Sequence, residues 1–154
     1  MKALIEAAFK NVILDGGASQ LQCEVMDNYG EGVTNEEFLR LPQKEITNDW
    51  AAVPEETLLY TAYLDDKGFR YYIPTFMISC LNRGDLVTET IFALDARPGD
   101  LWNYKMSQFS LLNLHQRSTI AQFLYSLPDL VEIRWHEDKV CIERAFTNYW
   151  HQYL

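Results

Sequence analysis

The chain has 154 residues, which fits one domain large enough to bury a substantial hydrophobic core. Its formal net charge of -9 makes nucleic acid and anionic membrane surfaces unfavourable partners, since both are negatively charged. The acidic residues are concentrated in the first half: residues 1–66 contain 13 Asp and Glu against 4 Lys and Arg, whereas residues 67–154 contain 9 of each. The negative electrostatic potential of the first half either keeps the protein soluble or attracts a basic partner.

The sequence predicts neither a metal, a cofactor nor a membrane segment. Its three cysteines form no Cys-x-x-Cys pair and have no histidine partner at metal-ligand spacing, so we interpret them as buried, reduced thiols. No run approaches the roughly 20 apolar residues that a membrane span requires, and the N-terminus lacks the features of a signal peptide. We therefore expect a cytoplasmic protein.

Two helices are predicted at the N-terminus. Apolar residues between Lys2 and Leu14 recur at the spacing of one helical face, and the Asp-Gly-Gly sequence at 15–17 is expected to stop that helix. Ser19 is suited to cap a second helix, which we expect to end near the Tyr-Gly-Glu-Gly sequence at 29–32.

The following segments predict a short helix, a connection and another helix. Thr34 and Glu37 have the spacing of a capping box, which indicates a helix that ends by Pro42. Residues 46–54 connect it to a helix opened by Pro54 and the two acids that follow. The side chains expected to be buried in this region are Trp50 and Val53 in the connection and Leu58, Leu59, Ala62 and Tyr63 in the helix.

The segment from Phe69 to Gly84 is almost entirely apolar and predicts a buried central helix. A residue that precedes proline is disfavoured in the helical region, so we expect Ile73 to be extended and Pro74 to open the helix. Residues 65–68 are expected to form the turn before this segment, and Gly84 to end the helix.

The second half of the chain predicts further helices. Residues 85–94 fit a helix but also a strand, and residues 131–135 leave the same question open. Asn113 and Gln116 indicate the cap of a helix that Pro128 ends, and a last helix follows. The fold expected from these elements is mainly α: a single-domain orthogonal bundle of about six or seven helices over residues 1–154, which allows one short strand pair.

The distribution of acidic residues favours a non-enzymatic binding protein that engages a basic protein partner. Electrostatic association of this kind weakens as the salt concentration rises. The acids expected to contribute lie in the first half of the chain: Glu31, Glu36, Glu37, Asp49, Glu55 and Glu56.

The alternative is a small enzyme or ligand-binding protein with its site at residues 63–72. Carboxylates next to tyrosines and an arginine can support proton transfer, and the candidates are Tyr63, Asp66, Arg70, Tyr71 and Tyr72. The same residues also fit a polar turn, in which Arg70 pairs with an aspartate and the tyrosine hydroxyls lie at the surface. A structural domain with no separable site is a third interpretation.

The end of the chain carries an aromatic stripe with the spacing of a core-facing helix. Aromatic surface that stayed uncovered there would mark an interface, and a homodimer is compatible with this composition. The residues of the stripe are Phe146, Tyr149, Trp150 and Tyr153.

Four fragments, taken in order, resemble a family of small bacterial proteins of unknown function. They are residues 5–9, the Tyr-Tyr-Ile-Pro sequence at 71–74, residues 112–124, and Tyr149 with Trp150. The resemblance implies a bacterial cytosolic protein and carries over no activity, cofactor or catalytic residue. In size and acidity the chain is also similar to bacterial immunity proteins, which neutralise toxins.

Overall fold

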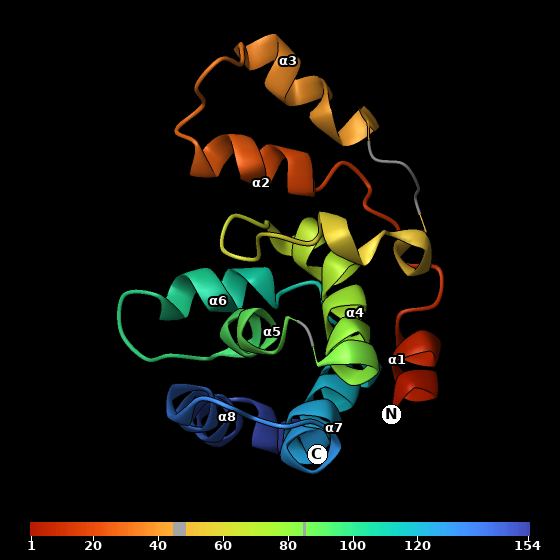
Figure 1. The fold of residues 1–154 in the computed structure, drawn as a ribbon, viewed down its shortest axis with the longest axis vertical. Coiled ribbons are helices and arrows are strands. Elements are labelled where there is room, and N and C mark those ends of the chain that lie inside the picture. The colour runs from red at the N-terminus through yellow and green to blue at the C-terminus, as the bar shows by residue number, and fades with distance from the viewer. Residues whose placement is uncertain (45–48, 85) are drawn as a thin grey trace.

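The computed structural model describes residues 1–44, 49–84 and 86–154 of the chain. Within these ranges it contains eight α-helices and four short 3-10 helices and no β-strand (Figure 1). The mainly helical class predicted from the sequence is therefore confirmed. The α-helices are more numerous than predicted, and the strand pair that the sequence allowed does not form in the described ranges.

The elements follow one another along the chain in a simple order. The α-helices are α1 (Lys2–Ala8), α2 (Gln20–Asp27), α3 (Asn35–Arg40), α4 (Asp66–Arg83), α5 (Val87–Leu94), α6 (Trp102–Gln108), α7 (Leu114–Leu130) and α8 (His136–Asn148). The 3-10 helices are η1 (Leu41–Lys44), η2 (Trp50–Ala52), η3 (Glu55–Thr57) and η4 (Trp150–Tyr153).

Helix α4 is the centre of the fold. Helices α1, α5 and α6 and the turns η2 and η3 all contact it, as Figure 1 shows for the three helices. Every residue of α4 from Gly68 to Cys80 is buried except Arg70, which confirms the predicted central helix. Gly84 ends the helix as predicted, in the left-handed conformation with a φ of 68°.

The predicted start of this helix at Pro74 is wrong, because α4 begins about two turns earlier. The Asp65 carboxylate caps it, accepting the Gly68 N–H at 2.8 Å and the Ala18 N–H at 2.9 Å. Residues 65–68 are thus the cap and the first turn of α4. Pro74 lies inside the helix, where it removes one backbone hydrogen bond, and the burial of its neighbours on every side outweighs that loss.

The N-terminal helix is shorter than predicted. Helix α1 ends at Ala8, and Asn11 has a φ of 65°, which takes the chain out of the helical region. Phe9 and Leu14 beyond the helix are nevertheless buried, so the apolar pattern continues in a non-helical segment. The three predicted caps are confirmed, since each accepts a hydrogen bond from the third residue of its helix: they are Ser19, Thr34 and Asn113.

The predicted helix after Pro54 is wrong, because only the short turn η3 forms and Leu59 is exposed. Amide side chains from distant helices bind the backbone here instead. The Gln20 carbonyl oxygen accepts the N–H groups of residues 59 and 60 at 3.0 and 2.9 Å. The Gln108 amide donates to the carbonyls of residues 61 and 64 at 3.1 and 2.7 Å. These bonds satisfy the backbone groups that a helix would otherwise pair internally.

Other predictions in this part of the chain hold in part. Trp50 and Val53 are buried as predicted, while residues 46–48 of the same connection lie outside the described ranges. The question at residues 85–94 is answered by helix α5, with residue 85 not described. Residues 131–135 form neither a helix nor a strand, although Val131 and Trp135 are extended. Helix α7 continues past Pro128, which corrects the predicted end by two residues.

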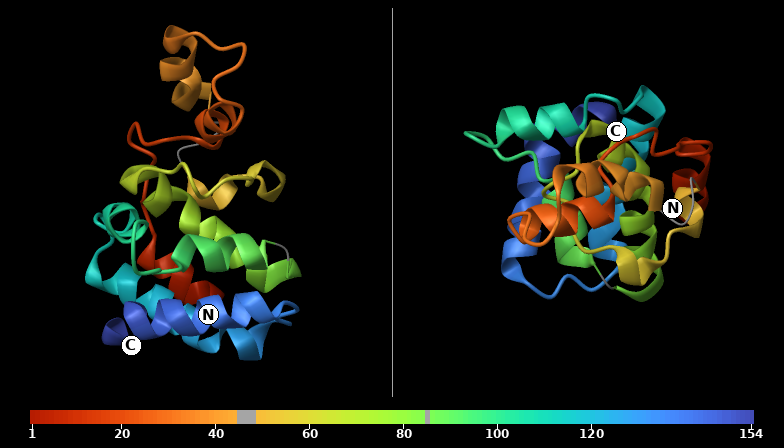
Figure 2. Two further views of the ribbon diagram at one scale, coloured as in Figure 1. Left: turned by 90° about the vertical axis from the view of Figure 1, so that its left-hand side faces the viewer. Right: turned by 90° about the horizontal axis from the view of Figure 1, so that it is seen from above.

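Helices α2 and α3 form a lobe at one end of the molecule, which we call the α2–α3 lobe (residues 19–40). Figures 1 and 2 show it standing apart from the body, with α7 and α8 at the opposite end. Helix α3 has no buried residue. The lobe is attached through α2, where Ser19, Gln20 and Cys23 are buried. Its outer surface is consequently accessible.

Candidate interaction surface

Helix α2 ends in a Schellman turn that carries a tyrosine at the position usually taken by glycine. The Gly30 N–H donates to the Val25 carbonyl at 2.8 Å, and the Tyr29 N–H donates to the Met26 carbonyl at 3.1 Å, which is the hydrogen-bond pattern of this motif. Tyr29 has a φ of 55°, a conformation that costs a bulky residue about 1 kcal/mol relative to glycine. Its side chain is 96% exposed. Tyr29 therefore weakens the turn and adds no packing to the fold.

Asp27 is the last residue of α2, two residues before Tyr29, and its carboxylate accepts a tyrosine hydroxyl. The Tyr63 hydroxyl donates to Asp27 Oδ1 at 3.3 Å, and the charge of Asp27 also acts on the Tyr60 phenol. Desolvation, followed by the negative charge of Asp27, raises the pKa of both phenols above its ordinary value. Both tyrosines thus remain neutral hydrogen-bond donors at neutral pH. Glu24 lies one turn before Asp27 and adds a second negative charge beside Tyr60.

Tyr104 of α6 extends this surface toward the body of the protein. Its hydroxyl donates to the Ala62 carbonyl, and desolvation raises the pKa of its phenol. Tyr104 also lies close enough to Tyr63 to interact with it electrostatically. We call the whole set the tyrosine–acid surface: Glu24, Asp27, Tyr29, Tyr60, Tyr63 and Tyr104.

The carboxylates of the tyrosine–acid surface are not neutralised within the protein. None of the ion pairs between described residues includes Glu24 or Asp27, and both side chains are exposed. Tyrosine is an amphipathic residue that is enriched at protein interfaces. The arrangement therefore combines aromatic contact area, hydroxyl groups and uncompensated negative charge on one accessible region.

Four of the acids predicted to bind a partner have local structural roles. Glu36 pairs with Arg40 one turn along α3, and Glu37 completes the capping box of the same helix. Hydrogen bonds from Thr34 hold the pKa of Glu37 below its ordinary value. Asp49 caps η2 by accepting the N–H of residue 51 at 3.1 Å.

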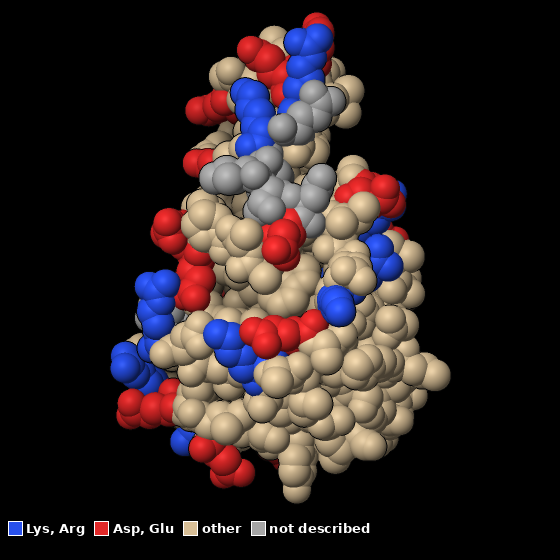
Figure 3. Space-filling view, turned by 90° about the vertical axis from the view of Figure 1, so that its right-hand side faces the viewer, with Lys and Arg blue, Asp and Glu red and all other residues tan. Residues whose placement is uncertain are grey.

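Glu55 is the fourth, since its carboxylate accepts the Ser79 hydroxyl at 2.8 Å and pairs with Arg83 at 2.9 Å. Glu31 and Glu56 are exposed, and they lie on different segments, the α2–α3 loop and η3. On the side of the molecule drawn in Figure 3, acidic and basic side chains are interspersed. The predicted acids are therefore spread over two regions, and only Glu31 lies near the tyrosine–acid surface in sequence.

The residues of the predicted alternative pocket differ in exposure and do not share one accessible surface. Tyr71 and Tyr72 are fully buried and pack edge to face with ring centroids 4.8 Å apart, so their hydroxyls are not at the surface as the polar-turn interpretation expected. Asp66 accepts the Ser110 hydroxyl at 3.2 Å. No described acid forms an ion pair with Arg70, and its Nε is buried without a hydrogen-bond partner. Only Tyr63 belongs to the accessible surface described above.

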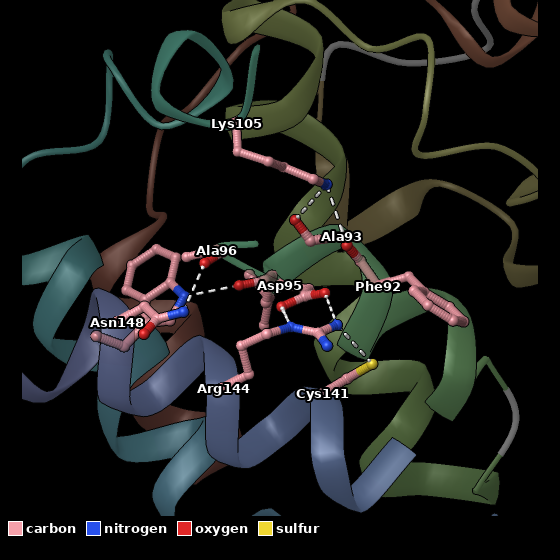
Figure 4. Close-up of polar contacts among 10 residues, drawn as sticks. Phe92, Ala93, Asp95, Ala96, Lys105, Cys141, Arg144 and Asn148 are labelled. Atoms are coloured by element: carbon pink, nitrogen blue, oxygen red, sulfur yellow. Dashed lines mark hydrogen bonds and ion pairs between the residues drawn. The ribbon is translucent and has the colours of Figure 1, made fainter. Parts of the chain in front are cut away.

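A cluster of charged side chains lies at the C-terminal end of α5 (Figure 4). Asp95 is only 4% exposed, and Arg144 of α8 binds both of its carboxylate oxygens, one of them from Nε at 3.0 Å. Lys105 of α6 donates to the carbonyls of residues 92 and 93, each at 3.0 Å. Cations in these positions satisfy the unpaired carbonyls at a helix end and interact favourably with its dipole.

Further contacts show that this junction holds helices together. The Trp150 indole donates to the carbonyl of residue 94 at 2.8 Å, and the Asn148 amide donates to that of residue 96 at 3.3 Å. Arg144 also reaches the sulfur of Cys141 at 3.2 Å. Burial lowers the pKa of Lys105 to about 8, with Asp95 acting in the opposite direction. Because each charge is bound within the protein, we assign the junction a structural role.

Sequence reasoning missed most of the tyrosine–acid surface, although one signal was present. The Asn-Tyr-Gly sequence at 28–30 lies at the predicted end of a capped helix, where a left-handed residue is common, and it places a tyrosine at that position. Tyr60 and Tyr104 gave no such signal, because they join the surface only through tertiary contacts.

The fold and the surface define a helical protein with an exposed patch of tyrosines and acids. The whole chain, residues 1–154, matches a family of unknown function, DUF6714, and it belongs to that family. No curated protein and no solved structure matches the chain. None of the helices in the described ranges is both long and apolar enough to cross a membrane.

Proposed function

We propose that this protein is a non-enzymatic binding protein that engages a basic protein partner through the tyrosine–acid surface. The observation that supports this proposal best is Tyr29, a fully solvated aromatic side chain in a conformation that favours glycine. A residue that costs folding free energy and makes no packing contact is accounted for by contacts outside the chain.

The chemistry of the surface suits such a partner. A tyrosine ring supplies a large contact area with little loss of side-chain entropy, and tyrosines are enriched among the residues that dominate interface energies. Glu24 and Asp27 supply negative charge that no described base offsets. The net charge of -9 adds a long-range attraction that speeds encounter with a basic protein.

The enzyme or small-ligand alternative has less support, although the Nε of Arg70 is buried without a hydrogen-bond partner. Two of its five residues, Tyr71 and Tyr72, are buried in the core, and Asp66 already accepts two hydrogen bonds from the protein. An immunity or inhibitor role, a bacterial cytosolic setting and a homodimer stay predictions. Each is compatible with binding through the tyrosine–acid surface.

A comparative pull-down tests the proposal. The tagged protein is incubated with lysate of its own organism, eluted with a salt gradient and compared with the Glu24→Gln/Asp27→Asn variant. We expect a basic protein that elutes at moderate salt from the wild type and is lost from the variant. A matched control neutralises two exposed acids of other regions, Glu132→Gln/Glu143→Gln, and should retain the partner. Equal retention by both variants would contradict the proposal.

A further inference from the structure

We infer that the tyrosine–acid surface recognises arginine, with the guanidinium group of a partner's arginine lying against the rings of Tyr29 and Tyr63 and paired to the Asp27 carboxylate. This inference rests on the proposed function and adds the chemical identity of the group that is bound. On this inference the surface binds arginine more tightly than lysine, although the two side chains carry the same charge.

The first argument is the combination of aromatic rings with a carboxylate. Tyr63 is exposed and bonded to Asp27 at 3.3 Å, and Tyr29 lies two residues after Asp27 in a turn that holds its ring in solvent. A guanidinium is planar, stacks on aromatic faces and binds a carboxylate through two N–H groups at once. A lysine ammonium is a strongly hydrated point charge that gains less from both contacts.

The second argument is the state of the Asp27 carboxylate. It accepts the neutral Tyr63 hydroxyl, which orients the group without cancelling its charge. An ionised carboxylate offers about four acceptor positions, so capacity remains for a bidentate donor. Glu24 stands one turn earlier on the same face of α2 and adds negative charge for a second basic residue of the partner.

The third argument is that the same kind of contact already exists inside this protein. The Arg117 guanidinium carbon lies 5.8 Å from the ring centroid of Tyr149 and 5.4 Å from that of Tyr153. Arg117 also donates to the hydroxyls of both tyrosines. A pair of tyrosines therefore accommodates one guanidinium in this fold. On the tyrosine–acid surface, Tyr29 and Tyr63 are exposed and close enough to interact electrostatically, and a carboxylate lies beside them.

The test compares two synthetic peptides of equal length and charge, hexa-arginine and hexa-lysine. Their dissociation constants are measured by titration followed in the amide NMR spectrum of the full chain, at low and at physiological salt. We expect hexa-arginine to bind about fivefold more tightly, the factor that a contribution of about 1 kcal/mol from ring stacking gives. The resonances that shift most should be those of residues 24–31 and 60–63.

Variants of Tyr29 make the test specific. Tyr29→Ala should remove most of the preference for arginine while leaving the affinity for hexa-lysine nearly unchanged, and Tyr29→Phe should restore the preference, because the ring is kept. The matched control is Tyr125→Ala, which removes a 64% exposed tyrosine from α7 and should change neither affinity. Since Tyr29 makes no packing contact, these variants should fold, which circular dichroism checks.

The outcomes separate this inference from the proposed function. Equal affinity for the two peptides, or a preference that survives in Tyr29→Ala, would overturn arginine recognition, and the pull-down would still decide whether a basic partner binds. The largest shifts falling outside residues 24–31 and 60–63 would also overturn it. If the pull-down fails while the peptides still bind with a preference for arginine, the proposed basic protein partner is contradicted. Recognition of arginine by the tyrosine–acid surface is then supported on its own.

Discussion

The tyrosine–acid surface and the junction at the end of α5 use charged and aromatic residues in opposite ways. At the junction, Asp95 is buried, and Arg144 and Lys105 are bound to oxygen atoms of the protein. On the surface, Glu24 and Asp27 are exposed and paired with no described base. A buried charge requires its partner for folding, whereas an exposed one can be replaced with little effect on stability. Pairing within the fold thus separates the charges of the junction, which have a structural role, from those that we propose to bind a partner.

The largest effect is expected when the junction loses its cation. Arg144→Ala leaves the Asp95 carboxylate buried without a partner and should lower the free energy of unfolding by about 3 kcal/mol, measured by urea denaturation. The control is Arg134→Ala, whose ion pair with Glu132 is exposed and spans 3.7 Å, and which should change stability by less than about 0.5 kcal/mol. If the two substitutions changed the free energy of unfolding by similar amounts, burial would not distinguish the ion pair of the junction from an exposed one.

A second prediction concerns the residue that attaches the lobe to the body. Gln20→Ala removes both acceptor bonds to residues 59 and 60 and the bond that its amide donates to the carbonyl of residue 60 at 2.8 Å. Because partly buried backbone groups lose three hydrogen bonds, we expect destabilisation of about 2 kcal/mol. Binding of hexa-arginine should weaken as well, since Tyr60 and Tyr63 lie on the same segment. Unchanged binding would show that this segment does not position the surface.

The pH dependence of stability sharpens the account of the junction. The pKa of Lys105 is about 8 in the folded protein, below its ordinary value in the unfolded chain, so the unfolded state binds more protons between these values. Stability contributed by this residue should therefore rise with pH, by about 1 kcal/mol from pH 7 to 9. The measurement is the difference in free energy of unfolding between wild type and Lys105→Met across that range, which cancels the ionisation of the cysteines. A difference that falls with pH would contradict the burial of Lys105.

The smallest effect on stability is expected at Tyr29 and has the opposite sign. Tyr29→Gly relieves the left-handed conformation and should raise the free energy of unfolding by about 0.5 kcal/mol, while it removes the preference for arginine peptides. The same substitution at Tyr125, within α7, should lower stability by about 0.5 to 1 kcal/mol, because glycine is unfavourable inside a helix. A loss of stability at Tyr29 would mean that its side chain supports the lobe.

The features that could be predicted from the sequence depend on neighbouring residues. The capping boxes at Ser19, Thr34 and Asn113 form as expected, because the residues that close each box are three positions apart. The buried centre of the fold also followed from the apolar composition of the segment from Phe69 to Gly84. Local spacing and composition are properties of the chain itself, so they act before any tertiary contact is made.

Tertiary structure decided the remaining features. Residues 58–64 are not helical because Gln20 and Gln108, about 40 positions away in either direction, bind their backbone. Pro74 lies inside α4 because its neighbours are buried on all sides. The tyrosine–acid surface combines α2, the segment before α4 and helix α6, and no spacing in the sequence relates these segments. Hydrogen bonding and burial between distant residues outweigh local preference at each of these places. The sequence alone therefore led to the hypothesis of an acidic binding protein but could not locate the surface that we propose for it.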